Sequence, residues 1–378
     1  MTTVTFENAA LASAVARAAR VAPTKGTAFD KAAGILMTVR PDDVNVACDV
    51  RSTNLEVDLV EAVDTIGIDS TETEIRWRLP SALLSGLMSA LPVGTGKTVT
   101  FRQERNTIHI DSGKMKASLQ LLPSADYSTW DRFDPEGLQP VEGFAQRIAS
   151  VSWACAKDSI PLSGVRIDGE YLLATDRYRM ARVPCKVPVA EPITVPLDVL
   201  GPILRTVEDA KVEATSRHLR IMPDAYTQIK AILFDADYPQ VERVMNMDAD
   251  FDAAVIVDRE ALRSAIQRIM VVTARGDRYP LIRLTFTPDA IGLFTRAESI
   301  GEIEDEIDAE PDTDLTPDGS MEFVVHFTPN FLSDALGGTD KPKVKISFTS
   351  TSPRRMVKFT DNEGYEAWVM PRKVEKAP

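Results

Sequence analysis

A glycine-rich run in the first third of the chain has the residue types of a phosphate-binding loop. It reads Gly94-Thr95-Gly96-Lys97-Thr98. A P-loop needs another glycine five positions before its Gly-Lys-Thr and a helix directly after it, because backbone N–H groups and a helix N-terminus must face the phosphates. Leu91 occupies the glycine position, and residues 98–103 alternate between apolar and polar as a strand does. The run therefore predicts a polar turn between a helix and a strand, and a nucleotide-hydrolysing enzyme is only a third hypothesis, which calorimetry with ATP would test.

Other residues with ligand chemistry also lack the spacing that a site needs. Asp248, Asp250 and Asp252 alternate like the start of a calcium loop, but Ala253 stands at its sixth position and Arg259 at its twelfth. The histidines have no metal-ligand spacing around them; they are His109, His218 and His326. No Gly-x-Ser-x-Gly nucleophile motif is present. We expect no catalytic residue, no metal site and no cofactor.

The composition indicates a globular protein of the cytoplasm with more than one domain. The chain has 378 residues, of which 44% are hydrophobic, and this length favours two or three domains. Its cysteines are odd in number and far apart in the sequence, which is typical of a reducing compartment; they are Cys48, Cys155 and Cys185. No signal peptide and no apolar run of about 18 residues is found, so neither export nor membrane spanning is indicated.

A net charge of −13 by itself argues against binding of nucleic acid. The distribution of the acidic residues along the chain changes this conclusion. Much of the acidity lies in residues 298–318, so the rest of the chain is nearly balanced and can carry a basic face. Within the acidic stretch, Ile303 and Ile307 are four positions apart. That pattern fits a half-exposed strand or loop better than a metal site.

Two kinds of helical segment each occur three times along the chain. The first kind follows a short strand, and its three helices are expected over Leu11–Val21, Phe144–Ala156 and Leu262–Met270. The second kind has proline near its first turn, where the missing N–H costs no helical bond; its starts are Leu79–Leu83, Val195–Val199 and Thr328–Leu332. Strands of period two lie between the helices, for example at Thr107–Ile110, Tyr171–Ala174 and Lys343–Phe348.

The repeats predict an α+β fold of three tandem domains, each with two helices backed by antiparallel sheets. Turn-forming residues mark the joins near residues 122–127 and 238–252. We therefore expect domains at 1–125, 126–249 and 250–378. If two such chains closed into an arc, the polar helix faces would line a hole wide enough for duplex DNA. The candidate DNA-facing residues, each of which also fits an ordinary solvated helix surface, are Arg17, Arg20, Lys25, Arg147, Lys157, Arg205, Arg263, Arg268, Arg275 and Arg278.

Four separated segments of the second and third repeats resemble one known family. They are Ile160–Val165 followed by Leu173–Ala181, then Tyr238–Val244, then Val369–Arg372. The run from Gly301 to Ile307 and the run from Phe327 to Leu336 agree as well. In order and total length the chain is similar to the beta sliding clamp of bacterial replicative DNA polymerases, the DNA polymerase III beta subunit family.

The resemblance implies a DNA-clamp fold and a head-to-tail homodimeric ring that encircles duplex DNA without sequence preference. Such a ring performs no chemistry, is loaded by a separate ATP-driven clamp loader and tethers the replicative polymerase. It also implies a hydrophobic pocket for partner peptides, which by motif would comprise Leu162, Thr175, Arg177, Tyr178, Arg179, Met180, Pro239, Arg243, Val244, Val369, Met370, Pro371 and Arg372. Methionine suits adaptable apolar walls, and Arg179 and Arg243 could hold peptide carbonyls or acidic side chains.

A second reading from another class is a monomeric peptide-binding adaptor that keeps the pocket without ring closure. Departures from the family pattern at Arg177, Met180 and the chain end after Arg372 imply a different peptide preference. A solution mass and a comparison of circular with linear DNA would separate the two readings.

Overall fold

The computed structural model gives the chain as two compact units. The structure describes residues 2–23, 31–43, 47–92, 94, 96–128, 130–198, 201, 204, 209–241, 245–246, 251–273, 280–297, 300–312 and 322–373. Unit 1 comprises residues 1–145, 188–190 and 195–233, and unit 2 comprises residues 146–187, 191–194 and 234–378. Each unit has its own sheets, helices and core.

Unit 1 is built on two antiparallel sheets. A five-stranded sheet has the order β5-β1-β7-β8-β9, and an eight-stranded sheet has the order β10-β15-β16-β17-β4-β3-β2-β6. The strands are β1 (Thr2–Glu7), β2 (Ile35–Val39), β3 (Cys48–Thr53), β4 (Val57–Val63), β5 (Thr65–Asp69), β6 (Ile75–Leu79), β7 (Thr98–Glu104), β8 (Thr107–Ser112), β9 (Met115–Gln120), β10 (Gln139–Val141), β15 (Ala210–Ala214), β16 (His218–Met222) and β17 (Thr227–Ile232). A short 3₁₀ helix, η1 (Pro135–Gly137), precedes β10.

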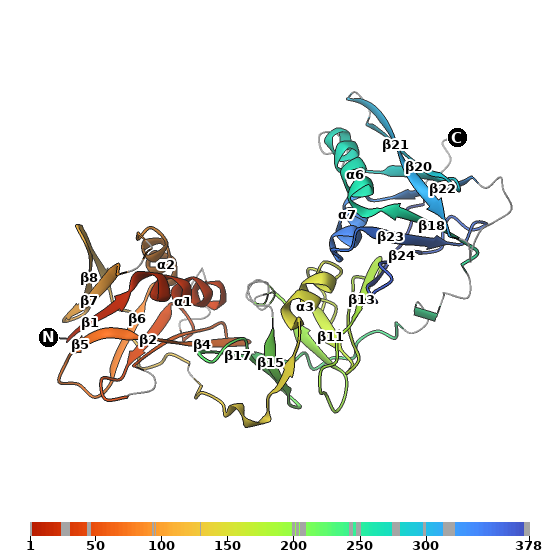
Figure 1. The fold of residues 1–378 in the computed structure, drawn as a ribbon. Coiled ribbons are helices and arrows are strands. Elements are labelled where there is room, and N and C mark those ends of the chain that lie inside the picture. The colour runs from red at the N-terminus through yellow and green to blue at the C-terminus, as the bar shows by residue number, and fades with distance from the viewer. Residues whose placement is uncertain are drawn as a thin grey trace. The chain divides into compact units, whose positions relative to one another are not determined.

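The helices of unit 1 are α1 (Asn8–Val21) and α2 (Ser81–Ser89), which pack against each other. Helix α1 also contacts β3 and β4 (Figure 1). It buries Leu11, Ala14, Val15 and Ala18, whose spacing of three and four residues places them on one helical face. The helix ends just before Pro23, with the Ala22 N–H donating to the Ala18 carbonyl over 3.0 Å.

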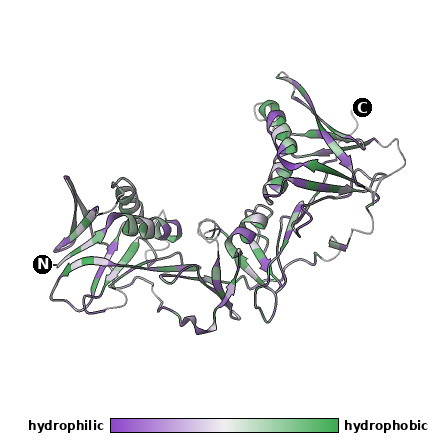
Figure 2. Ribbon diagram, in the orientation of Figure 1, coloured by the Kyte–Doolittle hydropathy of each residue, from purple (hydrophilic) through white to green (hydrophobic). Residues whose placement is uncertain are grey.

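Unit 2 is organised around a twelve-stranded sheet of the order β14-β11-β12-β13-β25-β24-β23-β18-β21-β20-β19-β22. Its strands are β11 (Gly164–Ile167), β12 (Tyr171–Thr175), β13 (Arg179–Pro184), β14 (Ile193–Pro196), β18 (Ala253–Asp258), β19 (Ile282–Phe286), β20 (Ala290–Ala297), β21 (Gly301–Pro311), β22 (Phe323–Phe327), β23 (Lys343–Phe348), β24 (Val357–Thr360) and β25 (Glu366–Val369). The helices are α3 (Phe144–Ser152), α6 (Arg259–Thr273) and α7 (Pro329–Gly337). Figure 2 shows hydrophilic and hydrophobic residues alternating along many strands, as expected for sheets with one covered face.

The helices and strands expected from the repeats are confirmed wherever the structure describes them. Helices α1, α3 and α6 follow β1, β10 and β18, and α2 and α7 begin at the expected prolines. Helix α3 ends at Ser152 rather than Ala156, because the Ala154 and Cys155 N–H groups bond three residues back instead of four. The second proline-led start, Val195–Val199, lies partly outside the described residues.

The glycine-rich run forms the expected turn between helix α2 and strand β7. Gly94 and Gly96 have φ angles of 144° and 75°, a backbone region that favours glycine. The Lys97 N–H donates to the Gly94 carbonyl over 3.2 Å, and β7 begins at Thr98. No helix N-terminus follows the run. Thr95 itself lies outside the described residues.

Both large sheets combine strands from two of the expected domains. In unit 1, β17 pairs with β4, so that Ile229 lies opposite Leu59. In unit 2, β13 pairs with β25, so that Met180 lies opposite Trp368. These ladders explain why contacts divide the chain into two units, while the three-domain boundaries stay a prediction.

The two joins between the expected domains carry the same anchor. Ala-Asp-Tyr occurs at residues 125–127, in the first join, and at residues 236–238, where the second join begins, and both tyrosines are buried. The Tyr127 hydroxyl donates to the Gly34 carbonyl over 3.1 Å, and the Tyr238 hydroxyl accepts the Thr175 N–H over 3.1 Å. An arginine lies over each ring, Arg78 at 4.9 Å and Arg166 at 5.6 Å from the ring centroids.

A buried carboxylate surrounded by arginines holds the segment after the first join onto the sheet of unit 1. Asp49 on β3 is 1% exposed and bonds to Arg40 at 3.0 Å, Arg51 at 2.8 Å and Arg132 at 2.8 Å. Burial raises the pKa of the Asp49 carboxyl, but Arg51 and Arg132 outweigh burial and lower the pKa below its usual value. The carboxylate therefore stabilises the fold in its charged form.

We expect Asp49→Asn to lower the unfolding free energy of unit 1 by about 3 kcal/mol or more at pH 7, because the arginine cluster loses its one buried anion among the described residues. The folded-state pKa is the lower one, so this stabilisation is present above the unfolded pKa of about 4 and fades as pH falls through the folded value. Calorimetric melting of both proteins from pH 7 to pH 3 checks this. Asp111→Asn, at a half-exposed ion pair with Arg102, is the control. A constant difference between wild type and variant at every pH would contradict the assignment.

Candidate functional site

The candidate site in unit 2 is built on three neighbouring strands, β12, β13 and β25. The register places Met180 on β13 opposite Thr175 on one side and Trp368 on the other. Side chains two residues apart share a sheet face, so Met180 and Arg182 point to the same side as Trp368 and Glu366. This face carries an apolar part and a charged part.

The apolar part is a cluster that we call the Met180–Trp368 cluster. Its buried members are Leu162, Leu173, Met180, Tyr238, Val241, Met356 and Trp368, and its partly buried members are Ala156, Met245 and Met370. Four methionines together with an indole give an adaptable apolar surface. Met245 and Met370 remain half-exposed at its edge, where a ligand side chain can reach them.

The turn between β12 and β13 is fixed by its own side chains. The Thr175 hydroxyl donates to the Arg179 carbonyl over 2.6 Å and accepts the Arg177 N–H over 3.1 Å. Asp176 accepts the N–H groups of Tyr178 and Arg179 over 2.9 and 2.8 Å. With Arg177 held at φ 78°, the turn presents the Tyr178 ring outward, 62% exposed. The Tyr178 carbonyl accepts the Met370 N–H over 2.8 Å, which ties the turn to the end of β25.

Arg179 already has partners on every side of its guanidinium. It bonds to Asp176 at 2.9 Å and to Asp334 on α7 at 2.6 Å. It lies 4.3 Å from the Phe331 ring centroid and 5.5 Å from that of Trp153. Burial raises the pKa of Asp334 although the arginine opposes the shift. Arg179 therefore fastens the turn to α7, and it would have to exchange a carboxylate to hold a peptide.

The charged part of the face borders the Met180–Trp368 cluster. Glu366 accepts from Arg182 Nε over 2.6 Å and from Lys358 Nζ over 2.7 Å. Arg182 and Lys358 both lie over the Trp368 ring, 5.7 and 5.1 Å from its centroid. The Trp368 Nε1–H is buried and has no hydrogen-bond partner in the part of the chain that the structure describes. Glu366 thus links two cations, Arg182 and Lys358, that both lie over the Trp368 ring.

The structure brings several of the thirteen predicted pocket residues together. Leu162, Met180 and Met370 join the Met180–Trp368 cluster, and the buried Thr175 and Val369 hold the adjoining backbone. Pro371 is half-buried. The exposed members are Arg177, Tyr178, Pro239 and Arg372. Arg243 and Val244 lie outside the described residues.

Several members of this cluster were not among the predicted pocket residues. Trp368 lies on β25, which reaches the cluster through its long-range pairing with β13, and Met356 lies directly before β24. No local pattern marks either residue. Tyr238 could have been found, because it repeats the tyrosine of the first join. Val241, Leu173, Met245 and Ala156 are ordinary apolar residues in the sequence.

The candidate DNA-facing residues have mixed surroundings. Arg17 is paired with Glu61, whose hydrogen bond raises the pKa of the Arg17 guanidinium, and Arg268 is paired with Asp305 at 2.7 Å. Arg147 donates to the Pro184 carbonyl. Arg263 is half-buried, and Arg20 and Lys157 are exposed. The candidates outside the described residues are Lys25, Arg205, Arg275 and Arg278.

The remaining motifs form no ligand site in the described residues. Asp252 accepts the Ser350 N–H over 2.6 Å, while Asp248 and Asp250 lie outside the described residues. His109 bonds to the Ser118 hydroxyl over 3.0 Å, and burial lowers the pKa of both His218 and His326. Across the described ranges, no three histidine, cysteine or acidic side chains are grouped closely enough to hold a metal ion. No described helix has the length and apolar composition to cross a membrane.

Sequence comparison finds relatives, one of which aligns with nearly the whole chain. Residues 247–373 match the family described as DNA polymerase III beta subunit, C-terminal domain. The chain is 25% identical to the beta sliding clamp of Streptomyces coelicolor, over 97% of this chain and 98% of that protein. It is 22% identical to the beta sliding clamp of Rickettsia bellii, over 71% of this chain and 75% of that protein.

Solved structures share the fold. The DNA polymerase III beta subunit of Thermotoga maritima superimposes with a TM-score of 0.82 at 20% identity, over 99% of this chain and 100% of that chain. A Pseudomonas aeruginosa sliding clamp bound to griselimycin gives a TM-score of 0.79 at 20% identity, over 99% and 100% of the two chains. The α+β clamp fold expected from the sequence is confirmed. The family match over residues 247–373, the full-length relative and this fold together support a bacterial-type beta sliding clamp.

Proposed function

We propose that this chain is a DNA sliding clamp, in which two copies close head to tail around duplex DNA and hold the replicative polymerase there. The observation that carries the proposal is the clamp fold over 99% of the chain together with a full-length clamp relative. A closed ring stays on DNA by topology, so only weak contacts to phosphates are needed and the ring can slide. The ring acts in the cytoplasm, performs no chemistry and depends on a separate ATP-driven loader.

Two sheet edges support head-to-tail closure. Strand β9 is the edge of the five-stranded sheet of unit 1 and exposes Lys116. Strand β21 in unit 2 pairs with β18 only at residues 309–311, so residues 301–308 have no strand on that side in the described part of the chain. Exposed carboxylates follow one face of β21, at Glu302, Glu304, Glu306 and Asp308. Unpaired edges of opposite charge are suited to join two copies.

We expect Lys116→Glu to weaken the dimer about 5- to 30-fold, since two symmetric contacts each lose about 1 kcal/mol. Adding Glu306→Lys in the same chain should restore much of the affinity, and Lys31→Glu, at another exposed lysine of unit 1, should change little. Sedimentation measures the dissociation constants. Equal weakening by Lys31→Glu, or no rescue by Glu306→Lys, would contradict this interface.

A ring must stay linked to DNA that has no free end. We expect the loaded protein, with twice the mass of the 41.5-kDa chain, to remain on nicked circular DNA and to leave after the circle is cut. Gel filtration of both DNA forms at raised salt measures retention, because salt weakens phosphate contacts but not topology. Equal retention would rule out a sliding ring, and a monomer that binds partner peptides would favour the adaptor reading.

Basic residues on the helices supply the proposed contacts to DNA. Arg20 and Lys157 are exposed. Arg17 and Arg268 are paired with carboxylates, which reduces the positive potential that each contributes. A ring can slide along DNA only if each contact between the protein and a phosphate is weak. Arginines that are already paired with carboxylates bind phosphates weakly and so meet this requirement.

The Met180–Trp368 cluster is the proposed docking site for partner peptides, together with the predicted pocket residues around it. Its half-exposed Met370 and the exposed Tyr178 ring offer apolar and aromatic contact area.

We expect Met370→Ala to weaken binding of a peptide from the organism's own replicative polymerase about tenfold, because about 1.4 kcal/mol of apolar contact is lost. Fluorescence polarisation with the labelled peptide measures the affinity. Met115→Ala changes another half-buried methionine, on β9, and serves as the matched control. The same affinity for both variants would remove the Met180–Trp368 cluster as the docking site.

A further inference from the structure

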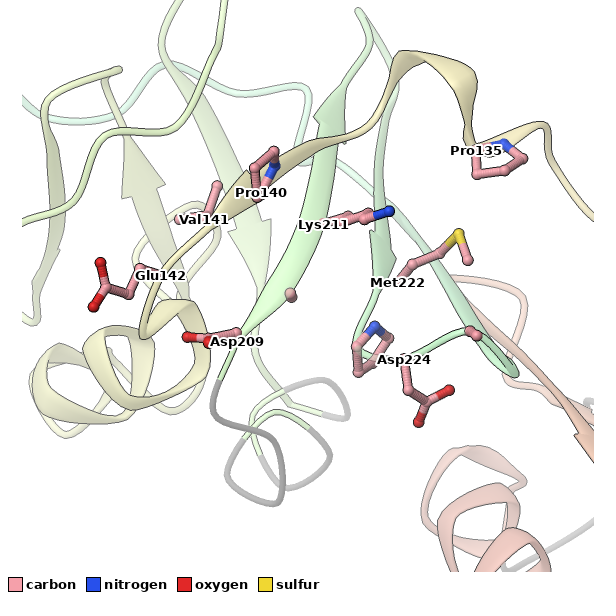
Figure 3. Close-up of a pocket in the computed structure, with 11 residues that line it drawn as sticks. Pro135, Pro140, Val141, Glu142, Asp209, Lys211, Met222 and Asp224 are labelled. Carbon is pink, nitrogen blue, oxygen red and sulfur yellow. The ribbon is translucent and has the colours of Figure 1, made fainter.

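Unit 1 contains a cavity of about 510 Å³ that the clamp function does not use. It lies over β10 and β15 and the turn that joins β16 to β17 (Figure 3). Its volume falls within the range of about 300–1,000 Å³ that is usual for ligand pockets.

The floor of this cavity, which we call the Pro140 pocket, follows from the strand register. Pro140 lies opposite Lys211, and Lys211 lies opposite Met222, so the three side chains form one row across the sheet. Pro135 of η1 and Pro223 of the β16–β17 turn add apolar walls. Proline rings lose little entropy when a ligand covers them, because they have almost no rotamer freedom.

Hydrogen bonds hold both walls in place. The buried Gln228 amide donates to the Phe133 carbonyl and accepts the Phe133 N–H, each over 3.0 Å, directly before η1. On the other wall, Asp224 accepts the N–H groups of Tyr226 and Thr227 over 2.8 and 2.7 Å. A Cβ on Gly137 would lie 2.6 Å from the Glu213 carboxylate, so η1 fits closely on the sheet. The pocket is therefore formed before any ligand arrives.

Its charges are unbalanced. Glu142 and Asp209 lie at one end of the pocket, whereas the Lys211 side chain extends toward Met222 and Pro135 (Figure 3). Val141 pairs with Ala210, so Glu142 and Asp209 face each other one step beyond the ladder. Asp209 accepts the Gly143 N–H over 2.7 Å, but within the described residues neither carboxylate has an ion-pair partner. With Asp224, three carboxylates and one lysine line the pocket.

A ligand peptide cannot readily bind this pocket by adding a strand to the edge of the sheet at β10. Strand β10 is the edge of its sheet, but it is short and its central residue, Pro140, has no N–H to donate. A ligand must therefore be held by its side chains: an apolar group on the Pro140–Met222 row and a cation between Glu142 and Asp209.

We propose that the Pro140 pocket binds a short basic peptide segment of a partner protein, with an apolar side chain over Pro140 and Met222 and an arginine or lysine at Glu142 and Asp209. Three carboxylates against one ammonium group provide the charge complementarity. This second docking site is independent of the Met180–Trp368 cluster and of ring closure.

The test uses the full-length protein with ¹³C-labelled methionine methyl groups and capped pentapeptides. The basic probe is acetyl-Ala-Leu-Gly-Arg-Ala-amide, and the others replace its arginine by glutamate or its leucine by serine. We expect the basic probe to shift the Met222 signal in a saturable way and to leave that of Met370 unchanged. Both altered probes should bind at least about fivefold more weakly, the loss expected for one ion pair or one apolar contact.

Glu142→Gln should weaken the basic probe about fivefold, and Glu56→Gln, at an exposed carboxylate elsewhere in unit 1, should not. The methionine spectrum reports whether each variant keeps its fold. Equal binding of the glutamate probe, a shift at Met370 in place of Met222, or full competition by spermidine, which has charge but no apolar side chain, would overturn the proposal.

Discussion

The backbone pairing of β13 with β25 is the constraint on which the candidate partner site depends. It joins strands that lie more than 180 residues apart in sequence, with Arg182 opposite Glu366. Because side chains alternate across a strand, this one register fixes which residues share the face with Met180. A slip by one residue would turn Trp368 away and bring Ala367 or Val369 in its place. The apolar cluster and the ion pairs beside it are thus two results of the same ladder.

Local patterns in the sequence predicted the local structure well. The spacing of Leu11, Val15 and Ala18 predicted α1, and Pro329 marked the start of α7. Leu91 at the missing glycine position excluded the P-loop. Long-range structure was less accessible, because Trp368 reaches the site through the pairing of β25 with β13, which no local pattern encodes. Helical periodicity likewise placed Arg268 on a polar face, but it could not reveal the carboxylate of Asp305 on a strand 37 residues away.

Charge in this protein acts through its location. Much of the acidity lies on features such as the exposed face of β21, which carries Glu302, Glu304, Glu306 and Asp308. In the interior, Asp49 stabilises the fold because it forms ion pairs with three arginines. Glu366 has the same role between Arg182 and Lys358. Single buried or half-buried anions thus hold together parts of the chain that are distant in sequence, whereas the surface anions remain open to solvent or partners.

The tyrosine anchors at the two joins have a consequence for sequence change. Surface loops usually tolerate insertions, since longer loops add little closure entropy. At these joins one added residue would pull Tyr127 from the Gly34 carbonyl or Tyr238 from the Thr175 N–H, leaving buried polar groups without partners. The arginine over each ring would lose its contact too. The segments that look most like linkers are therefore the ones whose length is least free to vary, so a fusion or an affinity tag belongs elsewhere in the chain.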